Sequence, residues 1–354
     1  MTMTDNYQTM HERYHAEKVF DTMFVDFQLT NTEFDGHLIY LLRQIKIDNH
    51  GHQNPLLKKL KKRLNPIVQG LKVSHSYTKD HSSWSVFYAF KEIIDQIKVQ
   101  LEPGYKTVYR GQPGDWELRP TLFRTGVAGY TDAFRQNYEQ TYKSVAQKFP
   151  ENVQYYTTQD LDLRAANLAE LQHCGLGTPL VDVSANPFIS MLFMVEGYTD
   201  QGNEPQLDVF FVREDGKNSL YQEVIKQEQN RRISAQQGAF LNFDKLTPDI
   251  SAGKHKIPRV CLRLQYVKSS LATSTANTLP DGNLPVDPDE SRIKAKALAT
   301  AVNDIKGKLT SYYYRIEDLF PDFYMYLDVL KTKYADTNQH DVKKWYQVSE
   351  PKNK

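Results

Sequence analysis

The chain has little cysteine, no excess charge of either sign and no long apolar run. Two of its 354 residues are cysteines, Cys174 and Cys261, which is too few for a disulfide framework and fits a reducing compartment. The formal net charge is +1, so whole-chain electrostatics do not predict binding to nucleic acid or to a membrane surface. Any basic surface must therefore be local.

Membrane and secretion signals are also missing from the printed sequence. The most apolar stretch, NPFISMLFMVEG, is too short for a membrane-spanning helix. The opening residues, MTMTDNYQTMHERYH, lack the apolar segment of a signal peptide. We expect a cytoplasmic protein without membrane association, long enough to bury a sizeable core in one large domain or two ordinary ones.

Helical patterns dominate the first hundred residues. HLIYLLRQIKI (37–47) has helical apolar spacing, and NPLLKKLKKRLNPIV (54–68) opens with a first-turn proline. SSWSVFYAFKEIIDQIKV (82–99) combines serine caps with an apolar face. We predict a helical N-terminal region over residues 1–80. The basic run KKLKKR (58–63) favours a solvated helix face over a contact with RNA.

The rest of the chain alternates between helices and strands. Helices are predicted at 131–149 and 161–171, and another opens at Pro187 with Asn186 as its cap. Strands are predicted at 107–111, 179–184, 207–214, 239–243 and 259–267. A long polar loop (269–291), helices at 291–305 and 315–334, and a frayed tail follow. The pattern predicts an α+β fold with a second domain over 81–335 and a tail over 336–354.

The segment VYRGQPGDWELRPTLFR (108–124) places an arginine directly before a glycine at the end of an apolar run. A guanidinium can grip a phosphate by a bidentate fork, and glycine lets a ligand approach the backbone closely. Arg110 and Gly111 therefore predict a site for a phosphorylated ligand. The alternative is an arginine that pairs with a carboxylate in the core.

Three parts of the sequence together resemble the FRG domain, a family named for its aromatic-Arg-Gly signature. They are YRGQPGDWELRPTLFR, LAELQHCGLGTPLVDVSANPFISMLF, and the pair RRISAQQGAFL and IEDLFPDFYMYLDVLK. Their order and spacing carry the resemblance, which extends from Ser82 to Lys331. Tyr109 stands where phenylalanine is commoner in the family, and Ser184 stands where threonine is usual.

The resemblance implies an ADP-ribosyltransferase-like fold: a mixed, split β-sheet core with a helical N-terminal region and closing C-terminal helices. It implies a toxin-type mono-ADP-ribosyltransferase of a toxin-antitoxin or anti-phage system, with NAD as co-substrate and no metal. The implied partners are a cognate antitoxin protein and an RNA or DNA target, with RNA favoured. An NAD hydrolase and a non-catalytic nucleotide-sensing or protein-binding module are the alternatives.

The resemblance also implies a set of site residues. The catalytic set is Arg110, Asp182 and Gln237. The NAD-binding set is Tyr109, Arg110, Gly111, Gln112, His173, Thr178, Ser184 and Gln236. Besides Arg110 and Asp182, three of these residues have a structural alternative: the ring of Tyr109 in core packing, His173 bound to a backbone carbonyl, and Ser184 as a turn former.

The late motif carries Gln236 and Gln237 but no glutamate, so the source of the usual catalytic carboxylate is open. Asp182 is flanked by apolar residues on a presumed central strand, where a buried carboxylate needs a partner. It is either a structural partner of Arg110 or Arg164, or the missing acid. Two glutamates upstream of the late motif are further candidates for the carboxylate, Glu223 and Glu228, and the favoured alternative is that they lie on a solvated helix face.

Overall fold

The computed structural model describes residues 6–34, 37–48, 50–52, 54–70, 84–99, 103–126, 129–199, 202–213, 219–223, 231–247, 250, 252–268, 288–320, 326–327 and 330–331. The strands are β1 (Phe20–Phe34), β2 (His37–Ile47), β3 (Tyr105–Gln112), β4 (Leu180–Ser184), β5 (Gln206–Arg213), β6 (Tyr221–Gln222), β7 (Gly238–Asn242) and β8 (Ile257–Tyr266). The α-helices are α1 (Tyr7–Arg13), α2 (Ala16–Val19), α3 (Pro55–Gly70), α4 (Trp84–Val99), α5 (Asp132–Gln136), α6 (Tyr138–Lys148), α7 (Leu161–His173), α8 (Pro187–Glu196), α9 (Arg231–Ala235) and α11 (Pro288–Ser311). Short 3₁₀ turns lie at Thr121–Phe123, Phe243–Lys245 and Ile316–Leu319.

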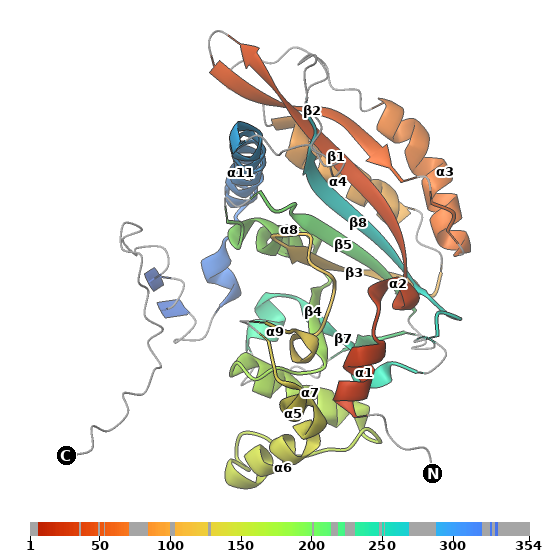
Figure 1. The fold of residues 1–354 in the computed structure, drawn as a ribbon, viewed down its shortest axis with the longest axis vertical. Coiled ribbons are helices and arrows are strands. Elements are labelled where there is room, and N and C mark those ends of the chain that lie inside the picture. The colour runs from red at the N-terminus through yellow and green to blue at the C-terminus, as the bar shows by residue number, and fades with distance from the viewer. Residues whose placement is uncertain are drawn as a thin grey trace, which may run out of the picture.

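All eight strands form one mixed sheet in the order β2-β1-β8-β5-β3-β4-β7-β6 (Figure 1). Strand β1 runs parallel to β8, and every other neighbouring pair is antiparallel. The ladder between β3 and β4 consists of a single pair, Tyr109 with Ser184. The sheet is therefore nearly divided at that point. The predicted α+β fold class is confirmed.

The prediction of a helix at 37–47 is wrong, because these residues form β2, which pairs along its length with β1. The helical N-terminal region predicted for residues 1–80 therefore fails over 20–47. Strand β1 buries Met23, Val25, Phe27 and Leu29 on one face, which is the period of two expected of a strand. This alternation was visible in the sequence and indicates a strand.

A bulge explains why β2 has the spacing of a helix. Gln28 pairs with Gln44 but Leu29 pairs with Leu42, so Arg43 is an extra residue on β2. An extra residue shifts the side-chain alternation by one position. Leu42 and Ile45 therefore face the same core although they are three residues apart, and this distance imitates a helical turn.

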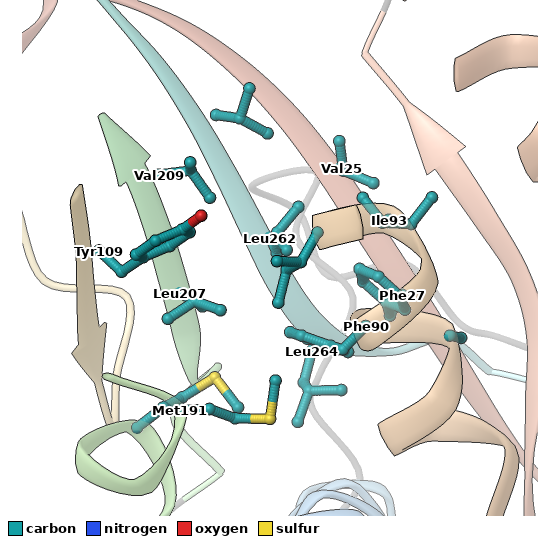
Figure 2. Close-up of a cluster of buried hydrophobic side chains, with 14 of the residues drawn as sticks. Val25, Phe27, Phe90, Ile93, Tyr109, Met191, Leu207, Val209, Leu262 and Leu264 are labelled. Carbon is teal, nitrogen blue, oxygen red and sulfur yellow. The ribbon is translucent and has the colours of Figure 1, made fainter. Parts of the chain in front are cut away.

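Apolar cores lie on both faces of the sheet. One contains side chains of α3, α4, α8 and α11 together with β1, β2, β5 and β8. Figure 2 shows part of it, where Phe90 of α4 stacks on Phe27 of β1 with ring centroids 4.0 Å apart. The other core contains side chains of α1, α6 and α7 with those of β4 and β7. Strand β3 contributes Tyr109 to the first core and Val108 to the second.

The helix signals in the middle of the chain are confirmed. Asn186 caps α8 by accepting hydrogen bonds from the backbone N–H groups of Phe188 and Ile189, and Pro187 occupies the first turn. Helices α3 and α4 lie where the sequence predicted them. Most of the predicted loop at 269–291, much of the predicted helix at 315–334 and the tail lie outside the described residues. Within the described residues, no helix is long and apolar enough to cross a membrane.

Candidate functional site

The aromatic-Arg-Gly triplet alternates between the two faces of β3. Tyr109 is fully buried among apolar side chains, and its hydroxyl lies 2.9 Å from the Thr107 hydroxyl oxygen. A Cβ added to Gly111 would lie 1.7 Å from the Ser190 carbonyl oxygen and 2.6 Å from the Met194 backbone nitrogen. Gly111 therefore allows α8 to pack against the strand. The hypothesis that it clears the way for a ligand is corrected, and the Tyr109 ring belongs to the core.

Arg110 points away from α8 and connects β3 to β4. Its Nη1 donates to the backbone carbonyl of Asp182 at 2.7 Å, and its Nε donates to Gln112 Oε1 at 3.1 Å. Burial lowers the pKa of the guanidinium, Asp182 opposes this shift and Arg124 reinforces it. Among the described residues these two bonds use two of the five N–H donors, so the others remain for an anion.

A chain of side-chain amides holds Arg110 in place. Gln112 is buried, and its Nε2 donates to the Trp116 carbonyl at 3.0 Å while its Oε1 accepts from Arg110. Gln206 of β5 donates to the same Trp116 carbonyl at 3.2 Å. Trp116 is 55% exposed, so an aromatic residue that is open to solvent supplies the carbonyl of this support. Sequence reasoning missed both Trp116 and Gln206, although Trp116 belongs to the motif that contains Arg110.

The strand next to Arg110 contributes a buried ion pair to the same face. Asp208 of β5 is the register partner of Arg110 and is fully buried. Its Oδ1 accepts from Arg259 Nε at 2.8 Å and from Arg259 Nη2 at 2.7 Å. Asp208 raises the pKa of Arg110 while Arg259 lowers it, so this pair contributes opposing charges to the site.

Asp182 is exposed, which corrects the expectation of a buried carboxylate that needs an arginine. Its Oδ1 accepts a hydrogen bond from Gln172 Nε2 at 2.8 Å, and Arg110 contacts only its backbone carbonyl. Arg164 instead binds Asp244 at 2.8 Å and forms an ion pair with Glu139. The carboxylate of Asp182 is therefore open to solvent at the division between β3 and β4.

Two predicted ligand-binding hydroxyls are buried and already engaged. Ser184 donates to the Gln236 carbonyl at 2.7 Å and accepts from the Asn186 N–H at 3.0 Å, which is the geometry of a turn former. Thr178 donates to Gln172 Oε1 and accepts from the Leu180 N–H at 3.3 Å. Both hydroxyls organise the backbone around β4, and neither is exposed to a ligand.

The late motif lies beside Ser184. Ser184 pairs with Gly238, and the Gln237 carbonyl accepts from the Ala185 N–H at 2.9 Å. Gln237 is exposed and has a φ of 47°, a left-handed conformation that costs a side-chain-bearing residue roughly 1 kcal/mol. Such strain at an exposed polar residue is a feature of functional sites. Gln236 is half-buried and donates from Nε2 to the Leu319 carbonyl at 3.2 Å.

The remaining predicted polar residues are more scattered. His173 is half-buried at the C-terminal end of α7, one residue from Gln172. Two arginines that were not predicted as site residues belong to the same motif as Arg110: Arg119 is bound to Glu117 by its Nε at 2.7 Å, and the exposed Arg124 acts on Arg110 through its charge. Of the other carboxylate candidates, Glu223 is exposed and Glu228 lies outside the described residues.

The basic run on α3 is remote from Arg110 because α3 packs on the opposite face of the sheet. Lys61 donates to the Asp48 carbonyl, and Arg63 holds Gln96 Oε1 with its Nε at 3.1 Å and its Nη2 at 2.7 Å. These contacts tie Lys61 and Arg63 to neighbouring parts of the chain, while Lys58, Lys59 and Lys62 are exposed. They support the interpretation of the run as a solvated helix face.

The fold and the site together define an α+β protein with an aromatic-Arg-Gly strand at the division of a mixed sheet. Residues 105–203 match the family model of the FRG domain. None of the curated proteins matches the chain, and no solved structure matches it. The family match ends before Gln236 and Gln237, whose place in the site depends on the contacts described above.

Proposed function

We propose that the chain is a toxin-type mono-ADP-ribosyltransferase that uses NAD to modify a nucleic-acid base, with RNA favoured over DNA. The proposal includes the ADP-ribosyltransferase-like classification of the fold and action in a toxin-antitoxin or anti-phage system. NAD hydrolysis without transfer is the second candidate, because the same exposed carboxylate and arginine would serve it equally. A non-catalytic nucleotide-sensing module is the third.

One observation carries the proposal: three separate motifs meet where β3 and β4 part. Arg110 bridges the two strands, the β4 motif supplies the exposed Asp182, and the late Gln236–Gln237 turn is held against Ser184. The resemblance to the FRG family implies the same three positions for NAD. Their convergence supports a common site, because the pairing of β4 with β7 and the Arg110 contact with β4 bring the polar groups of all three motifs to the same end of the sheet.

The chemistry follows from the charges on each side chain. The open N–H donors of Arg110 would hold the pyrophosphate. The N-glycosidic bond to nicotinamide breaks with its electron pair going to nicotinamide, and the ribose C1′ becomes positive. The Asp182 carboxylate would stabilise this oxocarbenium-like centre. An acceptor amine then forms the new bond to C1′ and releases a proton to solvent, or water does so in the hydrolase.

The test measures nicotinamide release and transfer of label from adenine-labelled NAD to cellular RNA. Labelled RNA supports the transferase, release without label supports the hydrolase, and binding without release supports the sensing module. Arg110→Ala should weaken NAD binding by about 30- to 150-fold, because a charged bidentate contact is lost. Arg63→Ala, a change on the opposite face, serves as the matched control. Equal NAD affinity in wild type and Arg110→Ala would remove Arg110 from the site.

Asp182→Asn tests whether Asp182 is the catalytic acid or only a structural residue. Because Asp182 is exposed and Arg110 uses only its carbonyl, the variant should keep its melting temperature and its NAD affinity while turnover is lost. Full turnover in Asp182→Asn would exclude the acid role. Gln237→Ala should spare binding and lower turnover, because its contact is expected to strengthen only as charge develops on the sugar.

The biological part of the proposal is tested in cells. Expression of the wild-type chain alone should arrest bacterial growth, and Arg110→Ala should relieve the arrest at the same protein level. A cognate antitoxin should co-purify from the native locus and restore growth. A chain that is non-toxic and has no partner would favour the binding-module alternative.

A further inference from the structure

Arg110 is bonded differently from other arginines of the protein's interior. Three of these are almost fully buried, and each forms an ion pair with a carboxylate of the chain: Arg135, Arg164 and Arg259. Arg110 instead directs its Nε to the Gln112 side-chain oxygen and its Nη1 to the Asp182 backbone carbonyl. Both acceptors are neutral, and among the described residues no carboxylate forms an ion pair with this guanidinium.

Charged groups act on Arg110 from neighbouring strands without pairing with it. Burial, the largest influence, lowers the pKa of the guanidinium. The carboxylates of Asp182 and Asp208 raise this pKa, and the guanidinium groups of Arg124 and Arg259 lower it. The Asp208 carboxylate is itself paired with Arg259. A buried charge that no contact neutralises is costly, and an anion at the open N–H donors of Arg110 would offset that cost.

The side-chain amide of Gln112 holds this guanidinium in one orientation. Gln112 is buried, its Oε1 accepts from Arg110 at 3.1 Å, and its Nε2 donates to the Trp116 carbonyl at 3.0 Å. A reversed amide would set N–H against N–H and oxygen against oxygen, so only this orientation is favourable. Gln206 donates to the same carbonyl at 3.2 Å and accepts from the Cys261 thiol at 3.2 Å, so the carbonyl stays bonded even without Gln112.

We propose that Gln112 is a positioning residue, which aims the Arg110 guanidinium at a pyrophosphate group without neutralising it. This inference rests on the proposed NAD site and gives Gln112 a role through Arg110 in place of a contact with the ligand. An amide oxygen accepts the hydrogen bond but carries no charge, whereas a glutamate of the same shape would pair with the guanidinium and compete with the phosphates. A side chain that is already ordered loses little entropy when the ligand binds.

The test titrates the full chain with ADP-ribose by calorimetry. This probe has the pyrophosphate of NAD but no nicotinamide, so it binds without turnover. Gln112→Met keeps the size of the side chain and removes both hydrogen bonds. It should weaken binding about 2- to 12-fold, because the Arg110 side chain must then be ordered by the ligand. Gln112→Glu should weaken binding more than Gln112→Met, because the new carboxylate pairs with the guanidinium.

A double-mutant cycle shows whether Gln112 acts through Arg110. The double variant Arg110→Ala/Gln112→Met should bind ADP-ribose as weakly as Arg110→Ala alone, since no guanidinium is left to position. Additive losses would mean that Gln112 contacts the ligand itself. The matched control is Gln222→Met in β6, which removes another buried glutamine that donates to Asp162 Oδ1 at 2.7 Å and to the Glu223 carbonyl at 3.0 Å. This control should bind ADP-ribose like wild type.

Four results would overturn the role of Gln112: no binding of ADP-ribose to wild type, wild-type affinity in Gln112→Glu, additive losses in the cycle, and a lower melting temperature of Gln112→Met with unchanged affinity. The last result would show that Gln112 serves only the fold. ADP-ribose binding that follows the expected order, without release of nicotinamide from NAD, would remove the proposed transferase and hydrolase activities and leave the role of Gln112 in place.

Discussion

Gly111→Ala tests whether the glycine of the triplet serves the fold or a ligand. The new Cβ would lie 1.7 Å from the Ser190 carbonyl oxygen and 2.6 Å from the Met194 nitrogen. Both are backbone atoms, so no side-chain rotation can relieve the overlap. Ordinary contact begins near 3.4 Å, and α8 would have to move from β3 by roughly 1.7 Å.

Such a movement would open the core. Helix α8 buries Ile189, Met191, Leu192, Met194 and Val195, and interiors of this density do not yield without cost. Overpacking by one methyl group costs about 1–3 kcal/mol when side chains can adjust, and more when backbone must move. We expect Gly111→Ala to lose at least about 3 kcal/mol of unfolding free energy, a large part of the 5–15 kcal/mol that is typical of folded domains.

Urea unfolding followed by far-ultraviolet circular dichroism measures this loss. The matched control is Gly307→Ala, inside α11, where a Cβ meets nothing within 4 Å. That change should stabilise the protein by about 0.5–1 kcal/mol, since alanine favours a helix over glycine. A Gly111→Ala protein within about 1 kcal/mol of wild type, but with weakened NAD binding, would refute the packing role and restore the ligand hypothesis.

Three further changes test the neighbourhood of β3. Burial raises the pKa of the Tyr109 hydroxyl to about 12, above its ordinary value of 10.0. The neutral hydroxyl therefore stabilises the folded protein fully below pH 10, and this stabilisation is lost as the pH rises toward 12. Between pH 10 and pH 12 the unfolding free energy of Tyr109→Phe should therefore fall by about 1.4 kcal/mol less per pH unit than that of wild type, as measured by urea unfolding. The same pH dependence in both proteins would contradict this. Gln237→Gly should gain up to about 1 kcal/mol by relieving the left-handed strain, and a lower melting temperature would argue against strain. Asp208→Asn leaves the Arg259 charge buried without its carboxylate and should cost about 3–5 kcal/mol, whereas a neutral result would show that the pair is not needed.

Local signals in the sequence were sufficient to predict helices with a clear cap and strands with a clear apolar run. The cap at Asn186 and the proline after it predict α8, and the apolar runs predict β4 and β5. They failed at 37–47 because the bulge at Arg43 depends on pairing with β1, which is a property of two strands and not of one segment. A pattern read along a single segment does not contain that information.

The candidate site likewise contains residues that local sequence signals could indicate and residues that they could not. The residue type and the family resemblance single out Arg110 in the sequence, and its role in a site stays a prediction, whereas the neighbouring glycine serves the packing of α8. The groups that support Arg110, namely Gln206 and the Trp116 carbonyl, could not be predicted, because one comes from another strand and the other is a backbone group that any residue possesses. The exposure of Asp182 was also hidden, since apolar neighbours suggest burial unless the sheet divides beside that strand.

The alternation of β3 gives the triplet a physical explanation. Tyr109 and Gly111 share one face, where the first fills the core and the second admits the backbone of α8. Arg110 must then point to the other face, toward the division between β3 and β4. Two of the three signature positions are thus explained by packing alone, and they leave the arginine as the residue whose identity the packing does not require. Because a half-buried guanidinium with open donors costs stability, its presence there supports a ligand for it.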